Sequence, residues 1–264
     1  MRPRRSAFLL FVTFLISIPV VAQQPPQRDP QAIALLQRAY AALSGGQAIS
    51  DVTLTGTARR VAGSDDETGT AILKALATGA SRLDHSFPSG QRSEVRNTSA
   101  NPPAGSWSGP DRISHAIPYH NLMTDPSWFF PAFLIGRVLS SSNYVAAYVG
   151  HETRDSVAVE HLTISQTFAT SPQAGALLRH LSQIEIYLDS GTLLPVALAL
   201  NVHPDKDAGL DIPVEIRFSD YRRVSGAQVP FHIQKYLNNT LVLDLQFQTV
   251  ALNTGLTGSA FSIQ

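Results

Sequence analysis

The last third of the chain alternates apolar and polar residues with a period of two, and this pattern constrains the fold more than any other feature. Three such runs, residues 213–224, 229–237 and 240–252, are separated by the short polar turns 225–228 and 238–239. Because successive side chains of a β-strand point to opposite faces, each run predicts a strand with one apolar face. Turns this short join antiparallel neighbours. The segment therefore predicts a three-stranded antiparallel meander.

The same alternation recurs through most of the preceding chain. It predicts further strands from residue 49 onward and at residues 70–78, 81–87, 91–97, 144–149, 157–168, 182–188 and 193–202. Residues 98–118 are rich in Ser, Gly and Pro and predict a loop with one short strand near Trp107. Roughly ten strands with short connections predict one extended sheet, which curls at that size. The expected fold class is mainly β, a highly curved antiparallel sheet or incomplete β-barrel.

An N-terminal amphipathic helix and an internal apolar helix are expected to cover the concave face of this sheet. Asp29 followed by Pro30 is typical of a helix start, and the apolar stripe that follows ends before Gly45. Asp125 followed by Pro126 repeats the start signal and predicts a second helix over residues 125–139. This second segment is apolar nearly all round, as buried helices are. Pro131 is expected to bend it or to restart it after one turn, and residues 172–181 predict a further short helix.

The N-terminus has the organisation of a secretory signal peptide. Arginines 2, 4 and 5 precede an apolar run over residues 7–18, and Pro19 and small residues follow it. Cleavage is expected after Ala22, which defines residues 1–22 as signal peptide and residues 23–28 as a flexible leader. The apolar run is shorter than the roughly 20 residues that span a bilayer. The expected product is a periplasmic or secreted single domain, residues 29–264, with no transmembrane span.

Composition and motifs exclude several classes of function. The chain has no cysteine, which rules out disulfides, thiol catalysis and iron–sulfur clusters. Its formal net charge is zero, and no basic cluster indicates a nucleic-acid partner. Neither a dinucleotide-binding glycine motif nor a phosphate-binding loop occurs, and no nucleophile elbow is present. We therefore expect no cofactor, no catalytic residue and no enzymatic activity, although a hydrolase with dispersed residues remains an alternative.

Two groups of residues have side chains of metal-binding types. His115 and His120 lie five residues apart beside a proline, and residues 65–67 are all acidic. Exposed loop histidines and an exposed hairpin tip account for these groups. No metal site is therefore predicted.

An aromatic run in the internal apolar segment carries the sharpest functional hypothesis. We predict that ligand-binding residues are Trp128, Phe129, Phe130, Phe133 and Leu134. Large rigid apolar side chains could form the plug or wall of a ligand cavity. The alternative is an ordinary core helix that fills the interior and leaves no space.

Residues 218–226, 229–233 and 250–253, together with Phe261, resemble the closing signature of the LolA/LolB-like lipoprotein-carrier family. The resemblance implies an incomplete β-barrel around a hydrophobic cavity that helices plug. It also implies a periplasmic protein that binds a hydrophobic small molecule or acyl chain, from a lipid or lipoprotein, without catalysis. Other branches of this superfamily are similar to envelope-stress sensors. A protein-interaction module with an envelope protein partner is therefore the alternative function.

Overall fold

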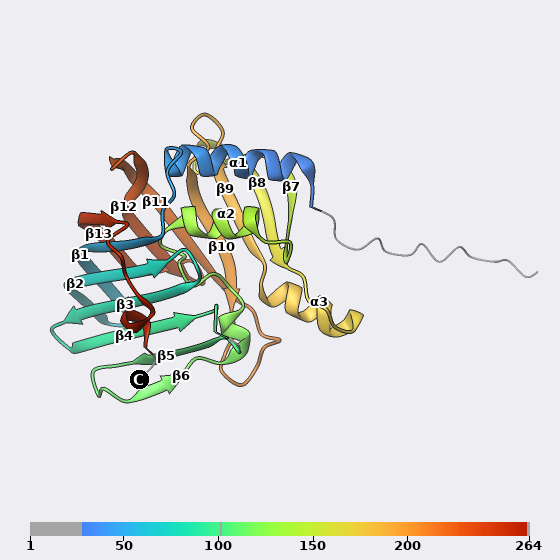
Figure 1. The fold of residues 1–264 in the computed structure, drawn as a ribbon. Helices are drawn as coiled ribbons and strands as arrows, with labels where there is room; N and C mark the ends of the chain where they lie inside the picture. The colour runs from blue at the N-terminus through green and yellow to red at the C-terminus, as the bar shows by residue number, and fades with distance from the viewer. Residues whose placement is uncertain (1–27, 101, 263–264) are drawn as a thin grey trace, which may run out of the picture.

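The computed structural model describes residues 28–100 and 102–262. All strands of this part of the chain belong to one antiparallel sheet of thirteen strands (Figure 1). From one edge to the other the strand order is β6-β5-β4-β3-β2-β1-β13-β12-β11-β10-β9-β8-β7. The first half of the chain supplies β1 (Asp51–Ala62), β2 (Asp65–Leu76), β3 (Ala80–Phe87), β4 (Gly90–Asn97), β5 (Ala104–Ser108) and β6 (Ser114–Ala116). The second half supplies β7 (Tyr144–Arg154), β8 (Val157–Gln166), β9 (Ile184–Asp189), β10 (Pro195–Val202), β11 (Ile212–Val224), β12 (Ala227–Leu237) and β13 (Thr240–Leu252).

The first and last strands of the chain, β1 and β13, are neighbours in the middle of the sheet. It steps outward from β1 to the edge strand β6, crosses to the opposite edge at β7, and steps inward to β13. The final strand then pairs with the first, in a register that places Val52 opposite Leu252. Every other pair of neighbouring strands is consecutive in the sequence. The link over residues 117–143 therefore has to cross the sheet from edge to edge. Its apolar residues, such as Phe129 and Phe133, are buried in the main core along this path.

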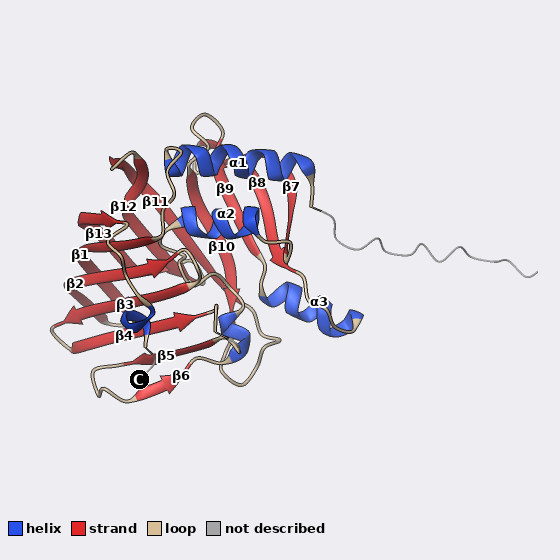
Figure 2. Ribbon diagram, viewed as in Figure 1, coloured by secondary structure: helices blue, strands red, loops and turns tan. Residues whose placement is uncertain are grey.

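The helices of the described chain are α1 (Pro30–Ser44), α2 (Pro131–Ser140) and α3 (Pro172–Leu181), with single 3₁₀ turns η1 (Tyr119–Leu122) and η2 (Gly258–Phe261). Helices α1 and α2 lie side by side over the half of the sheet that contains β7–β10, and both contact β7 (Figures 1 and 2). Helix α3 lies apart from them, beyond the end of β8. The sequence predictions of α1 as a cover for the sheet and of α3 at residues 172–181 are both confirmed.

Local chemistry sets the two ends of α1. The Asp29 carboxylate accepts a hydrogen bond from the Gln31 backbone N–H at 2.8 Å, and Pro30 occupies the first turn. Gly45 ends the helix with φ of 61°, a left-handed conformation that glycine adopts without strain. A Cβ atom at Gly45 would also lie 2.2 Å from the Gly226 carbonyl oxygen. The glycine therefore lets α1 end directly against the β11–β12 turn.

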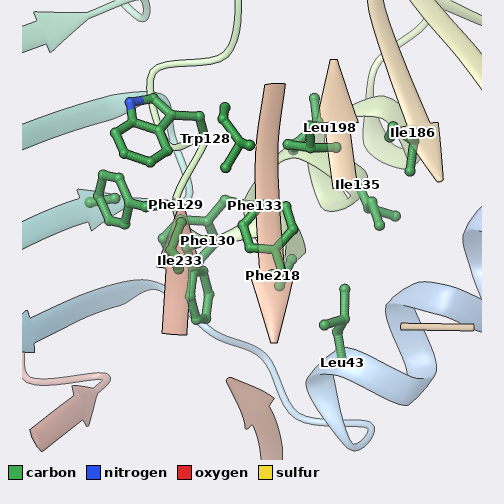
Figure 3. Close-up of a cluster of buried hydrophobic side chains, with 14 of the residues drawn as sticks. Leu43, Trp128, Phe129, Phe130, Phe133, Ile135, Ile186, Leu198, Phe218 and Ile233 are labelled. Atoms are coloured by element: carbon green, nitrogen blue, oxygen red, sulfur yellow. The ribbon is translucent and has the colours of Figure 1, made fainter. Parts of the chain in front are cut away.

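The main core lies between the inner face of the curved sheet and the two helices. The main core includes Leu36 and Leu43 of α1, the aromatic run that leads into α2, and inward residues such as Phe218 and Ile233 (Figure 3). A second, smaller cluster lies on the opposite face, where Phe261 of η2 packs against Ala80 and Val95. Leu76 belongs to this second cluster and Ala75 to the main core. This division follows from strand alternation.

Two sequence predictions need correction. Helix α2 begins at Pro131, where a restart was expected, but the preceding residues 126–129 form turns and not the first turn of a helix that starts after Asp125. The Asp125 carboxylate accepts from both the backbone N–H and the hydroxyl of Ser127 and pairs with Arg137. It therefore does not cap the expected helix. Residues 98–118 contain two strands, β5 and β6, where one was expected, and the sheet has thirteen strands where roughly ten were predicted.

The predicted signal peptide, residues 1–22, and most of the predicted leader lie outside the described residues. The last leader residue, Arg28, donates a hydrogen bond from Nη2 to the Val138 carbonyl oxygen at 2.6 Å. The chain is thus already held against α2 at this point. Among the described residues, no helix has the length and apolar character needed to cross a membrane.

Candidate functional site

The predicted ligand-binding residues lie together in the main core. All five are almost fully buried: the exposed fractions are 5% for Trp128, 0% for Phe129, 1% for Phe130, 3% for Phe133 and 0% for Leu134. The rings meet edge to face, with centroids 5.6 Å apart for Trp128 and Phe129 and 4.7 Å apart for Phe130 and Phe133. Aromatic pairs prefer this geometry. The structure therefore brings the predicted residues together as a packed interior.

Trp128 lies at the end of this aromatic row (Figure 3) and borders an open pocket. The pocket consists of two adjoining hollows, which we call the mouth pocket. One hollow is about 230 Å³ and the other about 310 Å³, and they share His85, Arg92, Lys235 and Leu243. The remaining lining residues are Ser93, Glu94, Leu83, Trp107, Ser108 and Trp128 in the smaller hollow, and Arg60, Phe87, Val202, Val214, Leu237 and Val242 in the larger one. The filled core and the mouth pocket thus meet at Trp128.

One side of the mouth pocket is apolar and aromatic. Several of its aliphatic residues also belong to the main core or pack against it. Both tryptophans of the chain line the smaller hollow. Trp128 is buried, whereas Trp107 is 42% exposed and stacks on His115 with centroids 4.4 Å apart. An indole face that is open to solvent at a pocket is suited to apolar contact with a ligand.

The other side of the mouth pocket carries charge. Lys235 follows Ile233 by two positions on β12, so strand alternation turns its side chain to the same inner face. Its Nζ atom lies 5.0 Å from the centroid of the Trp128 ring, within the range of cation–π attraction. Burial lowers the pKa of Lys235 from its ordinary value, and the nearby Glu94 carboxylate opposes this shift. The ammonium group is thus held in a partly desolvated position.

Two neighbours of Lys235 complete the polar side. Burial raises the pKa of the Glu94 carboxyl, but the charges of Arg96 and Lys235 outweigh burial and hold that pKa below its ordinary value. Glu94 also forms an ion pair with Arg96 at 2.7 Å. Burial lowers the pKa of His85 to about 4. The His85 ring is therefore neutral at neutral pH and adds no charge to the pocket.

Sequence reasoning found Trp128 and missed Trp107, Lys235 and His85. A signal for Lys235 was present, because a period-two reading of β12 places this lysine at an inward position after Phe231 and Ile233. A charged residue on the apolar face of a strand is unusual and marks a site.

The two histidines that were expected in an exposed loop lie in different elements: His115 is exposed in β6, and His120 is half-buried in η1. His115 stacks on Trp107, whereas His120 of η1 lies 5.9 Å from His203, between ring centroids. His203 itself belongs to a cluster with His180 and Asp211 that sequence reasoning did not assemble. At the acidic hairpin tip, Asp66 and Glu67 form ion pairs with the arginines at positions 59 and 60.

No family model and no curated protein matches the sequence. Solved structures do match it over most of its length. A domain from Vibrio parahaemolyticus that is named for outer membrane lipoprotein sorting superposes with a TM-score of 0.56 at 13% identity, covering 88% of this chain and 96% of that one. A LolA superfamily protein from Nitrosomonas europaea gives a TM-score of 0.54 at 11% identity, covering 88% and 97%.

The chain has a LolA-like fold. A DUF1329 family protein from Desulfovibrio piger shares this LolA-like architecture, with a TM-score of 0.55 at 12% identity over 90% of this chain and 100% of that one. The fold and the recognised resemblance are therefore confirmed. At this level of identity the likeness concerns the fold, and the ligand has to be argued from the mouth pocket.

The signature residues have structural roles in this LolA-like fold. The Asn253 side chain accepts from the Ser50 backbone N–H at 2.7 Å and donates to the Ala48 carbonyl oxygen at 3.0 Å. It thereby ties the end of β13 to the segment that leads into β1. Phe261 fills the smaller core on the outer face. Asn253 thus supports the central β1–β13 pair, whereas Phe261 packs against β3 and β4. Neither residue lines the mouth pocket.

Proposed function

We propose that this protein binds a hydrophobic ligand non-covalently, an acyl chain of a lipid or lipoprotein, in the mouth pocket. The observation that carries this proposal is an open pocket, beside a filled core, that is lined by both tryptophans of the chain. Of the predicted ligand-binding residues, Trp128 would contact the ligand directly. Phe129, Phe130, Phe133 and Leu134 would support it from behind as packed core.

The apolar side of the pocket supplies a driving force for binding. Each methylene group that moves from water to an apolar surface contributes about 0.8 kcal/mol. The larger hollow, about 310 Å³, lies at the lower end of the range for small-molecule pockets, about 300–1,000 Å³. It would therefore accommodate part of an acyl chain, with the remainder extending over Trp107 or into solvent.

The charged side of the pocket favours a ligand with an anionic group. Arg60, Arg92 and Lys235 line the hollows, against the single carboxylate of Glu94. Glu94 is already paired with Arg96 and Arg60 with Glu67, so Arg92 and Lys235 supply the positive charge that an anionic group would meet. A fatty-acid carboxylate or a phospholipid phosphate would lie beside these side chains while the chain covers the aromatic wall.

The predicted signal peptide supports a location outside the cytoplasm, in the periplasm, where free acyl chains of lipids and lipoproteins need a protein surface. The proposed role is therefore that of a carrier or a sensor of a lipid-like molecule.

Native mass spectrometry tests the proposal directly. Residues 23–264 would be purified from a bacterial periplasm without detergent, and we expect a discrete added mass that dissociates as a fatty acid or lipid. A titration of the delipidated protein with palmitate should then change the tryptophan fluorescence, because both tryptophans line the pocket.

A matched pair of variants locates the binding. Leu243 lines both hollows, so Leu243→Phe should reduce palmitate affinity by about tenfold or more by filling the space. Leu177→Phe makes the same change at a residue of α3 that is 49% exposed and should leave affinity unchanged. A clean mass for the purified chain together with no fluorescence response would refute the proposal and would favour the protein-interaction alternative.

A further inference from the structure

Three metal-ligating side chains from separate parts of the sequence converge beside α3. His180 lies in the last turn of α3, His203 directly follows β10, and Asp211 directly precedes β11. The Nε2 atoms of both histidines approach the same carboxylate oxygen, Oδ1 of Asp211, at 2.9 Å and 3.0 Å. All three ligand atoms lie within 4.8 Å of one another. The cluster is separate from the residues that line the mouth pocket.

The backbone of the fold holds this cluster in place. Asn121 of η1 donates to the His203 carbonyl oxygen at 2.8 Å and accepts from the His203 N–H at 2.9 Å. The Nε2 atom of His120 lies 3.1 Å from the Pro204 carbonyl oxygen. These contacts fix the start of the β10–β11 loop against η1. The position of His203 in the cluster is therefore fixed by backbone contacts between the β10–β11 loop and η1.

Burial distinguishes His203 from an ordinary surface histidine. Its side chain is only 1% exposed, and within the described part of the chain its Nδ1 atom has no hydrogen-bond partner. Burying a polar nitrogen without a partner costs about 1–3 kcal/mol. The hydrogen bond between Nε2 and Asp211 fixes the ring, and burial keeps Nε2 turned toward the carboxylate that His180 also approaches.

We propose that His180, His203 and Asp211 form a binding site for a divalent transition metal of the zinc class. Two imidazole nitrogens and one carboxylate oxygen are donors that Zn²⁺ accepts. Zinc–ligand distances of about 2.0–2.2 Å in a tetrahedron place neighbouring donors roughly 3.3 Å apart. The two separations from Asp211 Oδ1, 2.9 Å and 3.0 Å, would have to open by a few tenths of an ångström. The two histidine nitrogens lie within 4.8 Å of each other and would have to reach the same spacing by side-chain rotation.

The exposure of the other two ligands gives the ion a route to the site. The side chains of His180 and Asp211 are 46% and 40% exposed, so a metal ion could enter from solvent. Three protein donors leave a fourth position to water. A bound ion would connect the C-terminal end of α3 to the β10–β11 loop and would thereby restrain a helix that lies apart from α1 and α2 (Figure 1).

Isothermal titration calorimetry with Zn²⁺ on tag-free, EDTA-treated protein tests this site. We expect saturable binding of one ion per chain and no such binding of Mg²⁺, which prefers oxygen donors. His180→Ala and Asp211→Asn should each weaken Zn²⁺ binding by at least tenfold. Both replaced side chains are substantially exposed, so both variants should keep the far-ultraviolet circular dichroism of the wild-type protein.

A control histidine separates this site from weak surface binding. His151 is exposed and pairs with Glu160 at 3.0 Å, away from the cluster, so His151→Ala should bind Zn²⁺ as the wild-type protein does. Zn²⁺ should also raise the thermal midpoint of the wild-type protein and of His151→Ala, because an ion that binds the folded state stabilises it. It should not raise that of the two cluster variants. Absence of stoichiometric binding by the wild-type protein, or a loss of less than tenfold in either cluster variant, would overturn the proposal.

Discussion

The ammonium group of Lys235 lies above the indole ring of Trp128, with Nζ 5.0 Å from the ring centroid. The contact joins β12 to the segment that crosses the sheet between its two edges. It also joins the charged side of the mouth pocket to its aromatic side. A ligand with an acyl chain and an anionic group would meet both residues at once.

Lys235 should therefore contribute to selectivity between ligands of equal chain length. We expect Lys235→Met to weaken binding of palmitate by about tenfold, which corresponds to about 1.4 kcal/mol, and to leave binding of neutral methyl palmitate nearly unchanged. Tryptophan fluorescence titrations measure both affinities. Lys206→Met, in the exposed β10–β11 loop, serves as the control and should bind both ligands as the wild-type protein does. Equal losses for the acid and the ester would contradict a role for the positive charge.

Phe130 should contribute to stability as a core residue. It is 1% exposed and packs edge to face on Phe133, so Phe130→Ala should lower the free energy of unfolding by about 3–5 kcal/mol. Urea denaturation followed by circular dichroism measures this change. Tyr119→Ala removes an aromatic ring that is 50% exposed and should cost much less. A small effect of Phe130→Ala would show that the interior around α2 is loosely filled.

The ion pair between Asp125 and Arg137 should be strongly coupled, because the Asp125 side chain is 2% exposed and the Arg137 side chain 15%. Arg137 also donates to the Ala77 carbonyl oxygen at 3.0 Å. Removing one partner of a buried pair typically costs about 3–5 kcal/mol, and we expect a cost of this order for Asp125→Ala.

A double-mutant cycle tests this coupling. Arg137→Met in the Asp125→Ala background should cost less than Arg137→Met alone, with a coupling energy of at least about 1 kcal/mol. Unfolding in urea would be measured for all four proteins. Additive costs would mean that the two side chains act independently.

His85 should make stability depend on pH below neutrality. Its pKa is about 4 in the folded protein against an ordinary value of 6.5. Between these values the unfolded chain binds a proton that the folded chain does not. The free energy of unfolding should therefore fall as the pH is lowered from about 6.5 to 4, by up to about 3 kcal/mol from this group.

The neutral variant His85→Gln isolates this component. It should show a shallower loss of stability over the same pH window, measured as urea midpoints at several pH values. Identical pH profiles for the two proteins would contradict the buried, neutral state of His85.

Strand alternation allowed much of the sheet to be predicted from the sequence. The predicted bounds of the last strand, residues 240–252, agree with those of β13, because most of its inward positions are apolar and most of its outward positions are polar. Alternation specifies the face of a side chain but not the neighbouring strand. The pairing of Val52 with Leu252 therefore could not be predicted from the pattern.

The sites were less predictable than the fold for a related reason. The Asp125–Pro126 start signal and continuous hydrophobicity identified the aromatic run, which folds as one continuous segment of the core. Trp107 and Lys235 reach the same pocket from strands at different places in the sheet. His180, His203 and Asp211 likewise meet only after α3 and the β10–β11 loop have folded. Spacing along the sequence does not indicate which distant side chains lie close together in the folded protein.

The central position of β1 and β13 bears on the order in which the fold can form. As the chain is synthesised, β1 to β6 can pair as successive hairpins, each within a short stretch of sequence. One side of β1 nevertheless keeps its backbone hydrogen-bonding groups unpaired until β13 has been made, about 200 residues later. Unpaired strand edges invite association with other chains, and closure over such a separation is slow. A nascent or truncated chain that ends before residue 240 would therefore present an open edge in the middle of its sheet, so chaperone dependence and aggregation should change abruptly once the last strand is complete.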